Sequence, residues 1–294
     1  MAVGLARKSG FRVDEQIAAQ QVKANVAYIE HRRDSLHQGF FAAQVGAEAI
    51  GDLFGPGVLS YILVGLDAEH YESDLNTDAV AMYLNSRQMA DGSWAYGAPD
   101  SRPQICSDYI GQTALSMRAL QLYAPKVGQT EYEKSVRLAA AWLAKAEPKT
   151  NEDRIWRLIG LAWAASDKGA IKIAQQELLM MQRSDGGWSD LPAMESNAYM
   201  TGRTLFALQT AGLAASDPTY QRGVLFLLNS QSGYGSWYVQ TRALALQPYF
   251  DTGFPYGVDQ FISAAGTSWA TMALTLASQA PAASSISSAR ACLP

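Results

Sequence analysis

The side chains best suited to nucleophilic or metal chemistry are few and scattered along these 294 residues. The histidines are His31, His37 and His70, and the cysteines are Cys106 and Cys292. His31 and His37 are six positions apart, a spacing that does not place two ligands on one face of a helix. The cysteines show no CxxC spacing, so neither a zinc knuckle nor a disulfide framework is indicated. We therefore predict no metal site and no cofactor.

Short catalytic signatures are missing as well. The sequence contains no GxSxG, P-loop, GxGxxG, HExxH or DDxxD pattern. The net charge is −4 and no run of Lys or Arg is longer than Arg32-Arg33, so nucleic acid is not an expected partner. Apolar residues make up 48%, yet no uninterrupted apolar run is long enough to span a bilayer. We predict no transmembrane segment and leave peripheral membrane contact open.

One element of the sequence occurs three times. Each copy begins with Gln at the end of an apolar helical run and reaches Trp after five intervening residues. The copies are Gln88–Trp94, Gln182–Trp188 and Gln231–Trp237. Each contains Gly-Ser or Gly-Gly before the Trp, and Gly readily takes the left-handed conformation that ends a helix. Each copy is therefore predicted to be a turn between two helices.

The helices predicted after these turns share a second pattern. A threonine precedes the leucine of an Ala-Leu pair by seven residues in Thr113–Leu120, Thr201–Leu208 and Thr267–Leu274. Small residues let these helices approach their neighbours closely, whereas the helices before the turns carry charge on one face. We therefore expect two concentric rings, with the threonine helices inside.

The spacing of the copies predicts further repeats. Gln182 and Gln231 are 49 residues apart, and Gln88 and Gln182 are 94 apart, close to two such units. A degenerate copy is predicted between them, where a helix that ends at Glu147 is followed by a capping-box signal at Thr150.

The remaining sequence is assigned as follows. An earlier helix pair, roughly Val13 to His37 and Pro56 to Ala68, brings the count to about five. Residues 1–280 are predicted to form one domain, with a long loop inserted at 238–261, and residues 281–294 a tail or linker. The chain shows no N-cap or folded start before Asp14. This leaves open whether Met1 is a natural start or an internal methionine of a longer protein.

The Gln-x5-Trp element with Gly before Trp resembles the QW motif of squalene-hopene cyclases and related class II terpene cyclases, whose barrels are similar to those of prenyltransferase β subunits. The resemblance covers most of the chain. It implies an all-α fold, namely an α/α toroid of about five to six helix pairs. The motif residues would be structural, with the Gln amide bonding backbone groups and the Trp ring covering a neighbouring repeat. They are Gln88, Trp94, Gln182, Trp188, Gln231 and Trp237.

The whole chain also resembles a cyclase-like module at the C-terminal end of bacterial multidomain proteins, after a c-type haem CxxCH segment and often ankyrin repeats. The stretches that carry this likeness are the opening MAVGLARKSGFRVDE, residues 220–231 and residues 243–274. The resemblance implies a neighbouring domain of a longer chain and a periplasmic or envelope setting. The chain has no CxxCH of its own, so no haem is assigned to it.

Class II cyclases protonate an alkene or epoxide with an aspartate in an Asp-x-Asp-Asp-Thr-Ala motif. With the motif's threonine aligned on the repeat threonines, its acidic positions hold Tyr109, Gly111 and Gln112, or Asn197, Tyr199 and Met200, or Ser263, Ala265 and Gly266. The nearest carboxylates are Asp108 and Glu195, which are the candidate acids, although Asp108 at a helix start also suits an N-cap. The Asp, Cys and His zinc ligands of prenyltransferases are not matched either.

Aromatic side chains are the remaining candidates for a ligand site. Those on predicted inner helices are Tyr109, Trp163, Tyr199, Phe206 and Trp269, and those in the long loop are Tyr249, Phe250, Phe254 and Tyr256. Core packing is the alternative for the helical group. In the loop, Asp251 and Asp259 are expected to hold the backbone by side-chain hydrogen bonds.

Three hypotheses of function follow. The first is a cyclase-like module that binds an apolar, isoprenoid-like small molecule without the standard cyclase or zinc prenyltransferase chemistry. The second is a protein–protein interaction module of a larger polypeptide. The third is a divergent class II terpene cyclase that uses Asp108 or Glu195 as its acid.

Overall fold

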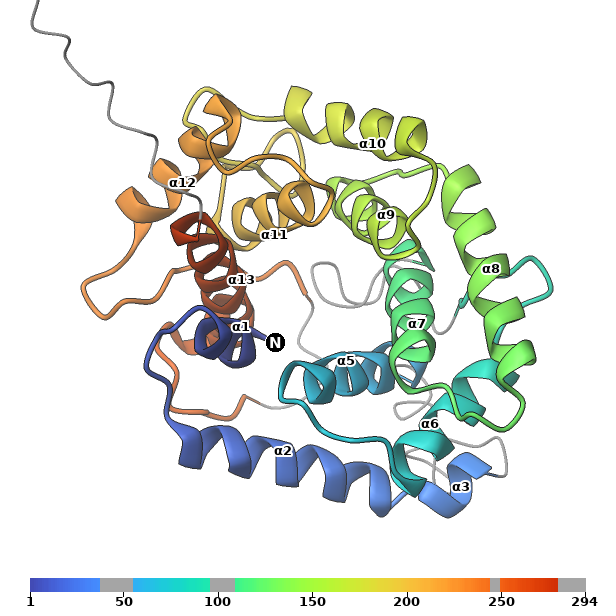
Figure 1. The fold of residues 1–294 in the computed structure, drawn as a ribbon. Helices are drawn as coiled ribbons and strands as arrows, with labels where there is room; N and C mark the ends of the chain where they lie inside the picture. The colour runs from blue at the N-terminus through green and yellow to red at the C-terminus, as the bar shows by residue number, and fades with distance from the viewer. Residues whose placement is uncertain (38–54, 96–108, 244–248, 280–294) are drawn as a thin grey trace, which may run out of the picture.

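The computed structural model describes residues 1–37, 55–95, 109–243 and 249–279. Within these residues every regular element is helical, and the fold is all-α. A unit of helix, turn and helix recurs along the chain. Figure 1 shows the helices in two layers around a common centre.

The inner layer is a closed circle of helices. It consists of α1 (Ala2–Lys8), α5 (Gly55–Ala68), α7 (Tyr109–Tyr123), α9 (Asn151–Trp163), α11 (Ala198–Thr210) and α13 (Gln260–Ser278). From α5 to α13 each of these helices packs against the next, and α13 also packs against α1. Gly4 of α1 lies so near α5 that a Cβ there would be 2.0 Å from the Ala68 carbonyl oxygen. A side chain at this position would therefore prevent the circle from closing.

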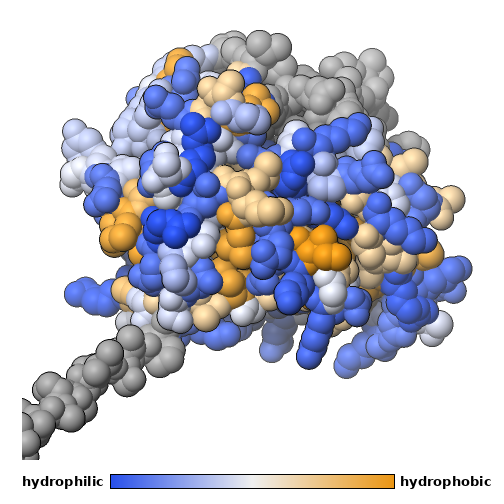
Figure 2. Space-filling model, turned by 90° about the horizontal axis from the view of Figure 1, so that it is seen from above, coloured by the Kyte–Doolittle hydropathy of each residue, from blue (hydrophilic) through white to orange (hydrophobic). Residues whose placement is uncertain are grey.

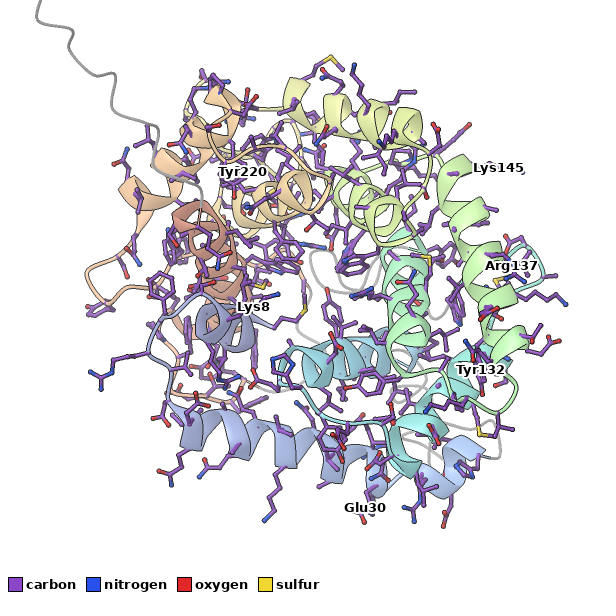
Figure 3. All side chains as sticks on the ribbon, viewed as in Figure 1. Lys8, Glu30, Tyr132, Arg137, Lys145 and Tyr220 are labelled. Carbon is purple, nitrogen blue, oxygen red and sulfur yellow. The ribbon has the colours of Figure 1, made fainter. Side chains whose placement is uncertain are left out.

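The outer layer covers the inner helices. It consists of α2 (Glu15–Glu30), α3 (Arg33–His37), α6 (Leu75–Ser86), α8 (Gln129–Lys145), α10 (Lys168–Met180) and α12 (Pro218–Ser230). On α8, Tyr132 is buried, whereas Arg137 projects into solvent (Figure 3). Tyr220 of α12 is fully buried, and its hydroxyl lies 3.3 Å from the Ala273 carbonyl oxygen of α13. The outer helices thus use one face for the inner layer and leave the other to water.

Short polar side chains begin these helices. Asp74, Thr150, Asp167, Asn197 and Asp217 each accept hydrogen bonds from backbone N–H groups of the first turn. These N–H groups have no hydrogen-bond acceptor inside the helix, so the capping side chains replace the bonds to water that folding would otherwise remove. At Thr150 the cap is the predicted capping box.

The Trp residues of the three Gln-x5-Trp turns share one geometry. Each Trp backbone N–H donates to a threonine hydroxyl of the following inner helix. The pairs are Trp94 and Thr113 at 3.0 Å, Trp188 and Thr201 at 3.0 Å, and Trp237 and Thr267 at 3.1 Å. Each indole N–H donates at 2.8 Å to the carbonyl of the leucine ten residues earlier, in the preceding outer helix. One buried side chain thereby joins both helices of a repeat.

The Gln residues fix the turn and reach the next repeat. In all three copies the amide Nε2 donates at 2.9 Å to the carbonyl of the glycine four residues on. These glycines adopt positive φ, which other side chains rarely do. They are Gly92, Gly186 and Gly235, with φ of 96°, 87° and 79°. Gln88 donates a second bond to the Ser135 carbonyl of α8, and Gln182 donates one to the Thr219 carbonyl of α12.

The structure corrects several predicted boundaries. No folded start is predicted at the N-terminus, yet α1 forms there and enters the inner circle. The stretch 13–37 is two helices, α2 and α3, rather than one. Helix α8 ends at Lys145 and not at Glu147. The reason is Pro148, which disfavours helical backbone at the residue before it.

Seen from above, the side with α10 and α12 is mainly hydrophilic, with apolar side chains interspersed (Figure 2). Exposed examples are Ile173 and Met180 on α10 and Leu225 and Leu228 on α12. Of the described helices, none is long and apolar enough to cross a bilayer. The predicted tail at 281–294 lies outside the described residues.

Thr201 of α11, which accepts the hydrogen bond from the Trp188 backbone N–H of the second turn, offers a direct test of the shared geometry. Thr201→Val leaves the backbone N–H of buried Trp188 without its acceptor, so we expect the free energy of unfolding to fall by about 1–3 kcal/mol. Urea unfolding measures the change. The matched control is Thr210→Val at the end of the same helix, because Thr210 Oγ1 donates only to the Phe206 carbonyl of its own helix. Equal effects of both substitutions would contradict the assigned role.

Candidate functional site

Aromatic side chains from four inner helices meet on one another. Trp156 of α9 lies at the centre of this group. Its ring centroid is 6.0 Å from that of Tyr61 on α5, 6.3 Å from Trp163 and 6.2 Å from Trp269 on α13. Phe206 of α11 lies edge to face on Trp269 at 5.3 Å. We call these residues, with Tyr199 and Arg203 of α11, the inner cluster.

Arg203 places a cation inside the inner cluster. Its side chain is fully buried, and its guanidinium carbon lies 4.9 Å from the Trp156 ring centroid, 4.8 Å from Tyr199 and 5.4 Å from Trp269. Nη1 donates to Glu152 Oε1 at 2.7 Å and to the Tyr199 hydroxyl at 2.5 Å. Nε and Nη2 have no hydrogen-bond partner in the described part of the chain. The electron-rich ring faces are therefore a large part of the environment of this charge.

The electrostatics keep the cluster charged. Burial by itself lowers the pKa of Arg203, but Tyr199 and Glu152 beside it raise that pKa well above its ordinary value. Burial raises the pKa of Tyr199, although Arg203 partly opposes this. Glu152 lies in the first turn of α9, where the helix dipole favours a negative charge. Arg203 is thus a permanent cation, and Glu152 is its counter-ion.

The structure brings together four of the aromatic residues predicted from the sequence, namely Trp163, Tyr199, Phe206 and Trp269. It adds Tyr61, Trp156, Arg203 and Glu152, which were not predicted. The sequence did contain a sign that Arg203 is buried, because this charged residue lies inside the repeat pattern that marks the inner helices. Tyr109, at the first residue of α7, is 38% exposed and makes no ring contact with the inner cluster.

The aromatic residues of the long loop form a separate group. Phe250 packs on Phe261 at 5.3 Å, while Tyr256 contacts Phe254 at 6.3 Å and Tyr238 at 5.5 Å. The fourth of the predicted loop residues, Tyr249, is exposed. None of these rings contacts the inner cluster. The loop aromatics and the inner aromatics therefore do not line one common site.

Polar side chains hold this loop in place. Asp259 accepts the Thr241 N–H at 2.8 Å and the Tyr238 hydroxyl at 3.0 Å. Asp251 accepts the Gly253 N–H at 2.8 Å. Gln260, which is buried, donates to the Phe250 carbonyl at 2.8 Å. These bonds fix the described parts of the loop, residues 238–243 and 249–259, against the start of α13.

The candidate acids do not lie in the inner cluster. Asp108 is outside the described residues. Glu195 is exposed, on a groove of about 300 Å³ that Phe226, Trp237 and Tyr238 also line. A general acid for an apolar substrate needs a site from which water is excluded, and an exposed carboxylate does not have one.

A second groove, of about 620 Å³, runs along α2. Its apolar wall includes Val22 and Val26, and Arg7 lies at its rim. Arg7 bridges Glu15 and Glu69 there, with both nitrogen–oxygen distances at 2.7 Å. We call this the α2 groove. Its volume lies within the range of ligand pockets, although five of its eleven lining residues are charged.

Metal ligands do not assemble in the described residues, among which no group of three or more His, Cys, Asp and Glu side chains converges. His31 caps the end of α2, and His37 is the last residue of α3. Both cysteines, Cys106 and Cys292, lie outside the described residues.

No protein-family model matches the chain, and no curated protein matches it.

The buried ion pair can be tested by a double-mutant cycle. Arg203→Met leaves Glu152 buried without a counter-ion, so we expect it to lower the free energy of unfolding by about 3–5 kcal/mol. Adding Glu152→Gln should recover most of this loss, because the remaining group is neutral. Urea unfolding of the two single variants and the double variant measures the coupling.

The control for this cycle is Arg137→Met. Arg137 is paired at 3.9 Å with Glu133 on the solvent face of α8, and such exposed pairs contribute about 0–1 kcal/mol. A loss in Arg203→Met no larger than in Arg137→Met would show that the buried pair does not stabilise the cluster.

Proposed function

We propose that this chain is an α/α toroid of the squalene-hopene cyclase and prenyltransferase type that works as a non-catalytic interaction module. The closed inner circle, the outer layer and the repeated Gln-x5-Trp turns support the fold part of the proposal. The inner cluster supports the functional part. The partner is a protein or a neighbouring domain rather than a substrate held at the centre.

The observation that carries this proposal is the place of Arg203. Class II cyclases hold a carbocation within an aromatic cavity, where ring faces stabilise positive charge. Here the ring faces of Trp156, Tyr199 and Trp269 already surround a cation that belongs to the chain and is paired with Glu152. A second positive charge among these rings would be repelled. The aligned acid positions, which hold no carboxylate, point the same way.

A second candidate is an apolar, isoprenoid-like ligand in the α2 groove. The volume of about 620 Å³ and the apolar residues on α2 favour it. In this case the ligand would lie between the layers near α1 and not at the centre. The divergent cyclase reading has less support, because Glu195 is exposed.

Incubation with squalene and with farnesol tests the proposal. We expect no cyclised product by gas chromatography with mass spectrometry, and no saturable change in tryptophan fluorescence, since Arg203 already occupies the ring faces and would repel a further cation. A cyclised product would overturn the non-catalytic assignment.

Variants of α2 test in the same experiment whether a ligand binds in the α2 groove. Saturable farnesol binding that is lost in Val22→Glu but kept in Ile17→Glu would replace our proposal by the second candidate. Val22 lines the groove, whereas Ile17 is an exposed residue of α2 that does not.

A further inference from the structure

One outer position of the ring holds no helix in the described part of the chain. The inner helix α1 lies in the circle next to α13, and its Gly4 meets the end of α5. Figure 1 shows α12 and α2 on either side of this pair, with loops and no described helix outside α13 and α1. Counted with the consecutive helices α2 and α3 as one, the described outer helices fill five positions, and we call this unfilled place the sixth outer position.

The first two Gln-x5-Trp turns show how an outer helix is held at an equivalent position. Gln88 bonds the Ser135 carbonyl of α8 at 2.8 Å, and Gln182 bonds the Thr219 carbonyl of α12 at 2.7 Å. The turn glycine lies directly under the same helix. A Cβ on Gly92 would be 2.5 Å from the Leu138 carbonyl oxygen. The turns therefore bind the backbone of the next outer helix and not merely its side chains.

The third turn, Gln231–Trp237, has the same internal geometry, but no described outer helix packs over it. Gln231 bonds the Gly235 carbonyl at 2.9 Å as its counterparts do, yet no second bond to a described helix is formed. A Cβ on Gly235 would meet only the Gln231 side chain, at 3.9 Å. Tyr234, between them, is 85% exposed. The binding surface is thus formed and unoccupied within the described residues.

Helix α12 presents an apolar residue to the same place. Thr219, Gly223 and Phe226 face the second turn, as their contacts show. At 100° per residue, Leu228 lies nearly opposite them on the helix, whereas Leu225 lies opposite the buried Leu227 and points away from the inner layer. Leu228 is more than half exposed. It forms the apolar wall that α12 offers to the sixth outer position.

We infer that the sixth outer position is a docking site for an amphipathic α-helix of a partner protein; this rests on the proposed interaction function. The two helices that fill equivalent sites define what it accepts. They carry a hydroxyl residue, a small residue four positions on and an aromatic residue three further on. These are Ser135, Ala139 and Trp142 in α8, and Thr219, Gly223 and Phe226 in α12.

Each position in this pattern has a physical reason. The small residue permits the close approach, since a Cβ on Gly223 would be 2.9 Å from the Trp188 ring. The aromatic residue covers the turn, as Trp142 does when its indole N–H donates to Asp91 at 3.2 Å. The partner helix binds by an apolar face laid into a groove, a common mode of helix recognition.

Other occupants fit less well. The chain's own helices with this pattern, α8 and α12, are already buried against their own turns, so a second copy has no free helix of this kind. Residues 280–294 contain no aromatic residue and therefore lack the pattern. The partner is identified by the pattern alone.

A tethered helix tests the inference. A second copy of residues 129–146 is fused before Met1 through about 12 Gly/Ser residues, which span roughly 20 Å and hold it at millimolar effective concentration. The chain with the linker alone is the baseline. We expect a higher urea midpoint and slower amide exchange in α12 and in residues 231–237. Ala139→Leu in the appended copy should remove both effects.

Matched surface variants show where the appended helix binds. Leu228→Glu should abolish the gain in midpoint, whereas Met180→Glu on α10, where the residue is even more exposed (77% against 52%), should leave it intact. Neither should change the midpoint of the unfused chain. No gain on fusion, or a gain that survives Leu228→Glu, would overturn the inference.

Two further outcomes separate the possible failures. A dimer of the unfused chain that Leu228→Glu dissociates would assign the site to a second copy and contradict the inference. A cyclised product from squalene would contradict the proposed non-catalytic function. It would not change the urea midpoint of the fusion, so it would leave the docking site untouched.

Discussion

The hydrogen bond from a turn tryptophan to an inner threonine is the constraint on which the rest of the structure depends. Trp188 donates its backbone N–H to Thr201 and its indole N–H to the Leu178 carbonyl, so one residue binds the helices before and after it. Both donors are buried, where an unpaired N–H is costly. The angle between outer and inner helix is therefore set at each repeat, and repetition of one angle bends the chain into a ring.

Closure of that ring decides what its interior contains. Small residues bring the inner helices together, and Gly4 admits the end of α5. The side chains that point inward then meet in a restricted space, where Arg203, Glu152 and Trp156 pack with further aromatic rings. A buried ion pair contributes little net stability compared with an apolar core, but it specifies which side chains must meet. The inner cluster therefore aligns α9, α11 and α13 with one another.

The same turn also explains the outer surface. Because Gln88 and Gln182 bind the next outer helix through its backbone carbonyls, the surface of these turns is specific for a helix at close range. The third turn keeps this geometry at Gln231 and Gly235 although no described helix covers it. A repeat structure thus carries a binding site wherever its series of helices is interrupted, without any new residue type.

The sequence by itself determined the repeating unit. Gln182, Trp188 and Thr201 lie within 20 residues, and their contacts are local, so residue type and spacing were enough to predict the helix, turn and helix. The tertiary structure alone decided the rest. Arg203 and Glu152 are 51 residues apart and meet only when inner helices from different repeats are packed side by side. The sixth outer position likewise exists only because α1 closes on α13, a contact between the two ends of the described chain that no local pattern encodes.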